Sequence, residues 1–254
     1  MTDRPMSDTL HLQIGEILDH AGKELGSTVT QQHRGGLGRD TLERELREIR
    51  DVVLRMGAAV ETAIGDAVRS LLDDDVALAQ AVIDGDVRVN ELQREVESLI
   101  TTVIATQQPV ARDLRFLLSL HHVGYELERI GDHAKSVAKH ALRLTDPGAS
   151  RPLVGLPEMG ALAASQLHAI LGALLEVDEV AARHVAAVDD DIDAQYHASF
   201  AELLEAMRAD AANVDSGTHL LLVAHDLERI GDRVTNIAED VVFLATGEIE
   251  DLNP

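Results

Sequence analysis

Leu127-Glu128-Arg129-Ile130-Gly131-Asp132 is the stretch that decides the fold, because the same six residues return at positions 227–232, 100 positions further along the chain. An upstream correspondence pairs Met56-Gly57-Ala58 with Met159-Gly160-Ala161 at an offset of 103. A net loss of three residues before the second hexapeptide reconciles the two offsets. The chain therefore contains two copies of one structural unit.

Apolar residues around each hexapeptide recur every three or four positions, which is typical of a helix packed into a bundle. The first series is Phe116, Leu120, Val123, Leu127, Ile130, Ala134, Val137, Ala141 and Leu144. The second is Leu220, Val223, Leu227, Ile230, Val234, Ile237, Val241 and Leu244. An aromatic content of 2%, with no Trp, also favours packed helices over a β-sandwich.

Turn residues divide each copy into three helices, so we predict an all-α fold of two tandem three-helix bundles related by the internal repeat. The expected helices are 42–72, 76–105 and 110–144 in the first copy, and 157–176, 178–210 and 216–246 in the second. The corresponding domains are a first repeat at 41–145 and a second at 156–247. Residues 1–40 are expected to form a flexible or loosely helical extension with a joint at 34–38.

The composition excludes several classes of function. Among 254 residues, 22 Lys and Arg face 45 Asp and Glu, and a net charge of −23 argues against a nucleic-acid partner. Because the sequence has no cysteine, a metal must be held by oxygen or nitrogen. Charged residues interrupt the N-terminal segment, and no apolar run approaches the length of a membrane span. We therefore expect a cytoplasmic protein without a signal peptide.

Carboxylates flank the apolar seam at matching places in both repeats. The Glu and Asp of the hexapeptide lie four residues apart, so that one stands a turn above the other, and the middle helices carry a similar pair. Neighbouring antiparallel helices would bring these pairs together as hard oxygen ligands, which suit Mg, Ca, Mn or iron. We predict a solvent-facing metal site on each bundle. The candidate ligands are Asp86, Asn90, Glu128, Asp132, Asp189, Asp193, Glu228 and Asp232.

A plainer interpretation stays open, because acid pairs arise by chance on solvated helix faces in a chain with 45 acids. Gly131 and Gly231 favour a site, since a glycine inside a helix costs roughly 0.5–1 kcal/mol relative to alanine. They indicate the close approach of a backbone or ligand, or tight packing between helices. Further candidates at or beside the acidic stripe are Asn236, Asp240, His121, His122 and His225.

Familiar catalytic motifs are missing from the sequence. No His follows a Glu by three positions, as a ferritin-like di-iron oxidase requires. The His-Glu-x-x-His, phosphate-loop and Gly-x-Ser-x-Gly motifs are absent as well. We therefore expect that the protein is not an enzyme.

Three groups of residues resemble the PhoU family, the regulators of bacterial phosphate uptake. They are Glu-Arg-Ile-Gly-Asp at 128–132 and 228–232, Gly85-Asp86 with Asn90, and Gln108-Pro109 followed by Asp113-Leu114-Arg115. The resemblance extends over about 40–247, and both copies match in order and spacing.

The resemblance implies a non-enzymatic adaptor that carries multinuclear iron or zinc clusters on its bundle surface, with Mn or Mg as alternatives. It also implies a homodimer that contacts the ATPase of the phosphate ABC transporter and the phosphate-sensing histidine kinase. Such a protein represses the starvation response and reaches the membrane only through its partners. The family's acid-x3-acid motifs correspond to the eight candidate ligands of this chain. Asn90 differs from the family pattern because it has no charge, so we expect the two sites to bind metal with unequal affinity.

Two other functions remain open at this point. One is a metal-dependent phosphohydrolase that uses surface carboxylates and two metal ions. The other is a metal-free helical scaffold. For any of the three, the strong acidity indicates basic partner surfaces.

Overall fold

The computed structural model describes residues 37–144, 153 and 155–253, and within them it contains helices and no strand. The first repeat consists of α2 (Leu37–Leu72), α3 (Val76–Gln107) and α4 (Arg112–Arg143). The second consists of α5 (Leu156–Glu176), α6 (Glu179–Ala187), α7 (Asp189–Ala209), the 3₁₀ turn η2 (Ala211–Asn213) and α8 (Val214–Thr246). The predicted all-α fold of two tandem helical bundles is confirmed.

The N-terminal prediction falls mostly outside the described residues. Its boundary at residue 40 lies within α2, which begins at Leu37. The joint expected at 34–38 is therefore wrong for Leu37 and Gly38, which are helical.

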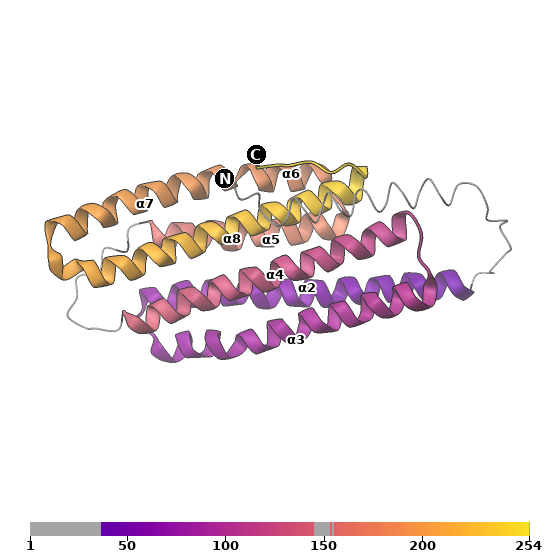
Figure 1. The fold of residues 1–254 in the computed structure, drawn as a ribbon, viewed down its shortest axis with the longest axis horizontal. Helices are drawn as coiled ribbons and strands as arrows, with labels where there is room; N and C mark the ends of the chain where they lie inside the picture. Colours follow the sequence, from indigo (N-terminus) through magenta and orange to yellow (C-terminus); the bar gives the residue numbers. More distant parts are fainter. Residues whose placement is uncertain (1–36, 145–152, 154, 254) are drawn as a thin grey trace, which may run out of the picture.

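The two repeats lie side by side with their helices along one common direction, as Figure 1 shows. Helices α2, α3 and α4 all contact one another, and α8 contacts α5, α6 and α7. Two helix pairs join the repeats, α4 with α8 and α2 with α5. The two helices that carry the hexapeptide thus pack against each other in the middle of the molecule.

Aspartate side chains cap the start of two helices, α3 and α6. Asp75 precedes α3, and its side chain accepts a hydrogen bond from the backbone N–H of Leu78 at 2.9 Å. Asp178 precedes α6 and accepts from the N–H groups of Val180 and Ala181 at 3.0 Å each. These side chains satisfy backbone donors that have no partner within the helix.

The middle helix of the second repeat differs from the prediction of one continuous helix over 178–210. It is interrupted at Val188, which separates α6 from α7, whereas α3 is continuous. Three consecutive acids, Asp189, Asp190 and Asp191, form the first turn of α7. Negative side chains are favourable at a helix N-terminus, so this run favours a new helix start over continuation. The break puts Asp189 at the first position of α7.

The repeated Met-Gly-Ala triplets mark the crossing of α2 and α5. A Cβ on Gly57 would lie 2.6 Å from Cδ1 of Leu171, and one on Gly160 would lie 2.6 Å from Cγ2 of Val68. Real Cβ atoms do not approach so closely, so glycine permits the contact between the two helices. The triplet is repeated because each copy supplies one side of this crossing.

Helix α5 is long and apolar enough to cross a membrane by length and composition alone. Half of its most apolar window is buried inside the protein, where α5 packs against α2 and α8. Because the core helix of a bundle has the same composition, packing accounts for the apolar character of α5.

Candidate metal centre

The hexapeptide helices α4 and α8 run antiparallel, and charged side chains flank their contact. Nδ1 of His133 lies 2.9 Å from Oδ1 of Asp226, and Nη1 of Arg233 lies 3.5 Å from Oε2 of Glu126. These two pairs occupy equivalent positions in the repeats, because Glu126 corresponds to Asp226 and His133 to Arg233. Neither pair was predicted from the sequence, although an acid and a basic residue seven positions apart in both copies are a usable signal.

A buried histidine strengthens this interface. Nδ1 of His122 lies 2.6 Å from Oδ2 of Asp240, and its Nε2 lies 3.4 Å from Oε1 of Glu126. Burial alone would lower the pKa of His122, but Asp240 outweighs it and raises this pKa to about 9. A surface position for His122 is therefore wrong, and Asp240 does not continue an exposed acidic stripe, because both lie buried between the repeats.

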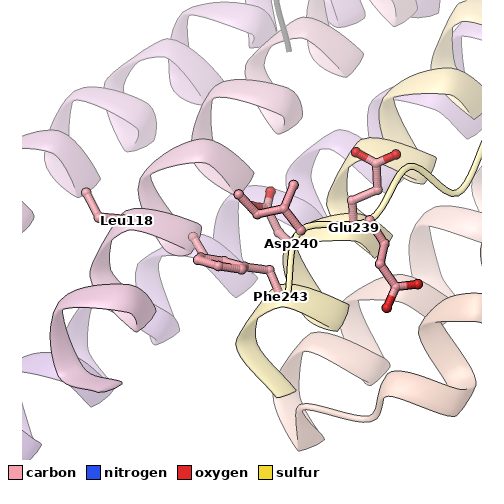
Figure 2. Close-up of a pocket in the computed structure, with 7 residues that line it drawn as sticks. Leu118, Glu239, Asp240 and Phe243 are labelled. Carbon is pink, nitrogen blue, oxygen red and sulfur yellow. The ribbon is translucent and has the colours of Figure 1, made fainter. Parts of the chain in front are cut away.

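A hollow opens beside this pair, between α4, α8 and the chain that follows α8. Figure 2 shows Asp240 and Phe243 of α8 in its wall, with Leu118 of α4. Its volume is about 10 Å³, which is room for about one water molecule. The hollow is too small to admit a phosphoester substrate.

The second repeat gathers its four candidate carboxylates between α7 and α8. Asp189 is 3% exposed, and the groups that contact its carboxylate, the Asn253 amide and the Thr235 hydroxyl, are both neutral. Burial, followed by the charges of Asp232 and Asp193, raises the pKa of Asp189 to about 7. Burial and Asp232 likewise raise the pKa of Glu228 to about 7. We call the surface formed by Asp189, Asp193, Glu228 and Asp232 the second face, and the surface formed by Asp86, Asn90, Glu128 and Asp132 the first face. The negative charge on the second face is poorly compensated, and a bound cation would relieve the resulting repulsion.

One arginine partly compensates this face. Nη1 of Arg229, the arginine of the second hexapeptide, lies 2.6 Å from Oδ2 of Asp232. Burial still raises the pKa of Asp232 despite the opposing effect of Arg229. The corresponding Arg129 of the first repeat instead lies over the ring of Tyr125, at 5.5 Å from its centroid.

The hexapeptide glycines allow the middle helices to approach closely. A Cβ on Gly231 would overlap the Asp189 carboxylate and lie 3.1 Å from Cδ1 of Ile192. A Cβ on Gly131 would lie 3.3 Å from Cγ1 of Val89, the residue equivalent to Ile192. Helix packing therefore accounts for both glycines, and in the second repeat the closest neighbour is the candidate ligand itself.

The first repeat brings its candidates together around a lysine. Nζ of Lys135 lies 2.5 Å from Oδ2 of Asp86 and 3.9 Å from Oδ1 of Asp132. The amide of Asn90 donates to the same Asp86 oxygen at 2.9 Å. Glu128 lies nearby, and burial, followed by the charge of Asp132, raises its pKa.

The predicted exposure of the candidate ligands needs correction. Asp86 is 7% exposed and Asp189 is 3% exposed, so both are buried rather than solvent-facing. Each belongs to a middle helix packed against the hexapeptide helix, which covers the carboxylate. The side chain of Asp132, in contrast, is 46% exposed. Each group of candidate ligands therefore includes a buried aspartate from the middle helix and more exposed carboxylates from the hexapeptide helix.

The two faces fit a metal unequally. Among the described residues, no three His, Asp or Glu side chains converge closely enough to hold an ion in their present positions. The donor set of the second repeat nevertheless suits a hard cation, because it offers four carboxylates and the buried Asp189 has no cationic partner among the described residues. The first repeat offers three carboxylates, of which Asp86 is already paired with an ammonium group.

The segment 247–253, which follows α8, folds back towards Asp189 of the second face. This contact was not predicted from the sequence. Both carboxylate oxygens of Glu250 accept hydrogen bonds from Arg183, at 2.7 and 2.8 Å. The backbone N–H of Leu252 donates to Glu239, and the amide of Asn253 donates to Oδ2 of Asp189 at 2.8 Å. No sequence pattern marks this docking, because it depends on single polar contacts.

Fold and site together define a class, that of tandem helical-bundle proteins with an acidic face on each repeat. The sequence model of the PhoU domain matches this chain twice, at residues 53–141 and 156–241. The chain belongs to the PhoU family.

Relatives and solved structures agree with this assignment. The Phosphate-specific transport system accessory protein PhoU homolog of Caulobacter vibrioides is 40% identical over 80% of this chain and 89% of its own length. The homolog of the same name from Clostridium acetobutylicum is 37% identical over 85% of this chain and 99% of its own. The crystal structure of PhoU from Pseudomonas aeruginosa superimposes with a TM-score of 0.78 at 34% identity, over 81% of this chain and 99% of that one. The crystal structure of the phosphate transport system regulatory protein PhoU from Streptococcus pneumoniae superimposes with a TM-score of 0.76 at 31% identity. This match covers 83% of this chain and 99% of that one.

Proposed function

We propose that this protein is a cytoplasmic regulatory adaptor that represses the phosphate-starvation response by contacting the ATPase of the phosphate ABC transporter and the phosphate-sensing histidine kinase. The support is its membership of a family whose relatives are named accessory proteins of a phosphate-specific transport system. The matches extend over most of this chain, including both acidic faces. A net charge of −23 favours encounter with basic surfaces on such partners.

The proposal includes metal binding, and one observation carries it: Asp189 is 3% exposed beside three other carboxylates, and its polar contacts with Asn253 and Thr235 bring no positive charge. Asp189 would be the buried ligand, with the half-buried Asp193, Glu228 and Asp232 completing the set. A bound cation supplies positive charge that offsets the repulsion among these groups. The hexapeptide helix would hold this charge at a fixed place for a partner to contact.

Purified protein and the purified ATPase subunit from the same organism test the proposal. Their association is measured by calorimetry after loading with Mn²⁺ and again after removal of metal with a chelator. We expect tighter association when metal is present, and the same loss of affinity in Asp232→Asn as in chelator. Asp191→Asn, which changes an exposed acid in the first turn of α7, is the matched control and should bind as the wild type does.

Two results would contradict this proposal. Association that is unchanged by chelator and by Asp232→Asn would leave a metal-free scaffold as the better account. Turnover of a phosphoester that Asp132→Ala and Asp232→Ala abolish would establish the phosphohydrolase instead. The homodimer implied by the family resemblance stays a prediction, which light scattering on the purified protein measures.

A further inference from the structure

The two repeats differ at one position that faces the candidate ligands. Lys135 lies three residues after Asp132, and the equivalent residue after Asp232 is Thr235. The two positions match because the hexapeptides are related by an offset of 100 without a gap. A cationic side chain in one repeat is thus replaced by a short, neutral hydroxyl in the other.

The ammonium group of Lys135 lies where a metal ion would lie if it bridged the carboxylates of Asp86 and Asp132. Its ammonium nitrogen is 2.5 Å from Asp86 on α3 and 3.9 Å from Asp132 on α4, so it spans the two helices that supply the carboxylates. The side chain of Asp86 is 6% exposed and that of Lys135 is 25% exposed. The contact is therefore shielded from water, unlike an ordinary pair of surface charges.

The other candidate ligand positions also leave less uncompensated negative charge in the first repeat than in the second. Asn90 replaces the acid found at Asp193, and its amide donates to Asp86 instead of offering a second charge. In the second repeat Arg229 pairs with the more open Asp232, while the buried Asp189 has only neutral contacts, with Thr235 and Asn253, among the described residues. Each buried aspartate thus has a different environment, Asp86 paired with an ammonium group and Asp189 without a cationic partner among the described contacts.

We propose that Lys135 is a built-in substitute for a metal ion, so that the first repeat is held together by its own ammonium group and only the second repeat loads metal. This inference deepens the proposed function and rests on it, because it assigns the metal of that function to one face. A metal ion at the first face would have to displace Lys135 from Asp86 with one carboxylate fewer than the second face provides. Ion and ammonium group compete for the same oxygen.

Exchange of residues between the repeats tests the inference. The double variant Asn90→Asp with Lys135→Thr gives the first repeat the side chains of the second. The metal-free full-length protein and the variant are incubated with Mn²⁺, passed through a desalting column and assayed for metal per chain. We expect the bound metal to double in the variant. The reciprocal variant, Asp193→Asn with Thr235→Lys, should lose the metal that the wild type carries.

Two further variants separate charge from disruption. Lys139→Thr makes the same change of charge at an exposed lysine one turn further along α4 and should leave the metal content at the wild-type value. Asp132→Asn should also leave it unchanged, because the first repeat holds no metal in the wild type. Circular dichroism of each metal-free variant checks that the helical fold is retained.

The outcomes distinguish this inference from the proposed function. If the wild type holds no metal but the double variant does, the proposed metal at the second repeat fails and the role of Lys135 stands. If the wild type holds metal that Asp132→Asn removes, or if the folded double variant gains none, the substitution of Lys135 for an ion is overturned.

Discussion

Replacement of Asp189 by asparagine should stabilise the metal-free protein. The variant removes one charge from a buried carboxylate that lies beside Asp193, Glu228 and Asp232. It keeps the shape of the side chain and an oxygen that can accept the hydrogen bond from Asn253. Neutralising this proposed metal ligand should thus have the opposite effect from removing an ordinary structural contact.

The magnitude follows from the raised pKa. An Asp that titrates near 3.8 in the unfolded chain and at about 7 in the folded protein binds its proton more tightly when folded. Stability therefore falls as pH rises through the interval between the two pKa values, and the full penalty remains above the higher one. Each unit of that interval is worth about 1.4 kcal/mol, and coupling to Glu228 shares the effect, so we expect roughly 2–4 kcal/mol at pH 8.

Urea unfolding in the presence of a chelator measures this difference. At pH 8 the free energy of unfolding should be higher in Asp189→Asn than in the wild type, while near pH 4 the two should agree closely. Asp191→Asn alters a neighbouring acid in the same helical turn but is exposed, so its effect should stay within about 0.5 kcal/mol. The reasoning is refuted if Asp189→Asn lowers stability equally at both pH values, since the carboxylate would then be well satisfied.

Three further predictions concern packing, the interface and the C-terminal segment. Gly231→Ala should lose about 1–2 kcal/mol of unfolding free energy by overlap with the buried carboxylate, whereas Gly85→Ala, with open space around its Cβ, should gain roughly 0.5–1 kcal/mol. Asp240→Asn should cost about 3 kcal/mol near pH 6 by leaving the protonated His122 without its partner. Urea titrations should show this cost shrinking as pH rises from about 6.5 to about 9, because a raised histidine pKa contributes stability that is lost between the unfolded and folded pKa values. Asn253→Ala should increase the rate of Mn²⁺ binding measured by stopped flow, and an unchanged rate would show that the contact does not limit access.

The sequence predicts the helices and their repeat because these depend on local spacing. Leu127 and Ile130, with their counterparts Leu227 and Ile230, are at most 1% exposed, as a seam of three and four steps requires. The break at Val188 was missed because apolar spacing continues through it. Only the charge of the following acids indicates a new helix start.

The candidate site was less accessible to sequence reasoning. The spacing of the hexapeptide predicts that Glu128 and Asp132 lie on one side of their helix. It gives no information on how deeply the hexapeptide helices bury Asp86 and Asp189 of the middle helices. The roles of Lys135 and Asn253 depend on contacts between elements that are distant in the sequence. A comparison of Lys135 with Thr235 was available from the repeat alone, and the structure shows why the difference matters.

Anomalous X-ray scattering from crystals grown with Mn²⁺ would show which repeat holds the ion, because it locates the metal without reference to a partner or an activity. We expect anomalous density between Asp189, Glu228 and Asp232, and none between Asp86 and Asp132, where Lys135 stays in place. Density at the first face with Lys135 displaced, or an empty second face at saturating Mn²⁺, would contradict this expectation.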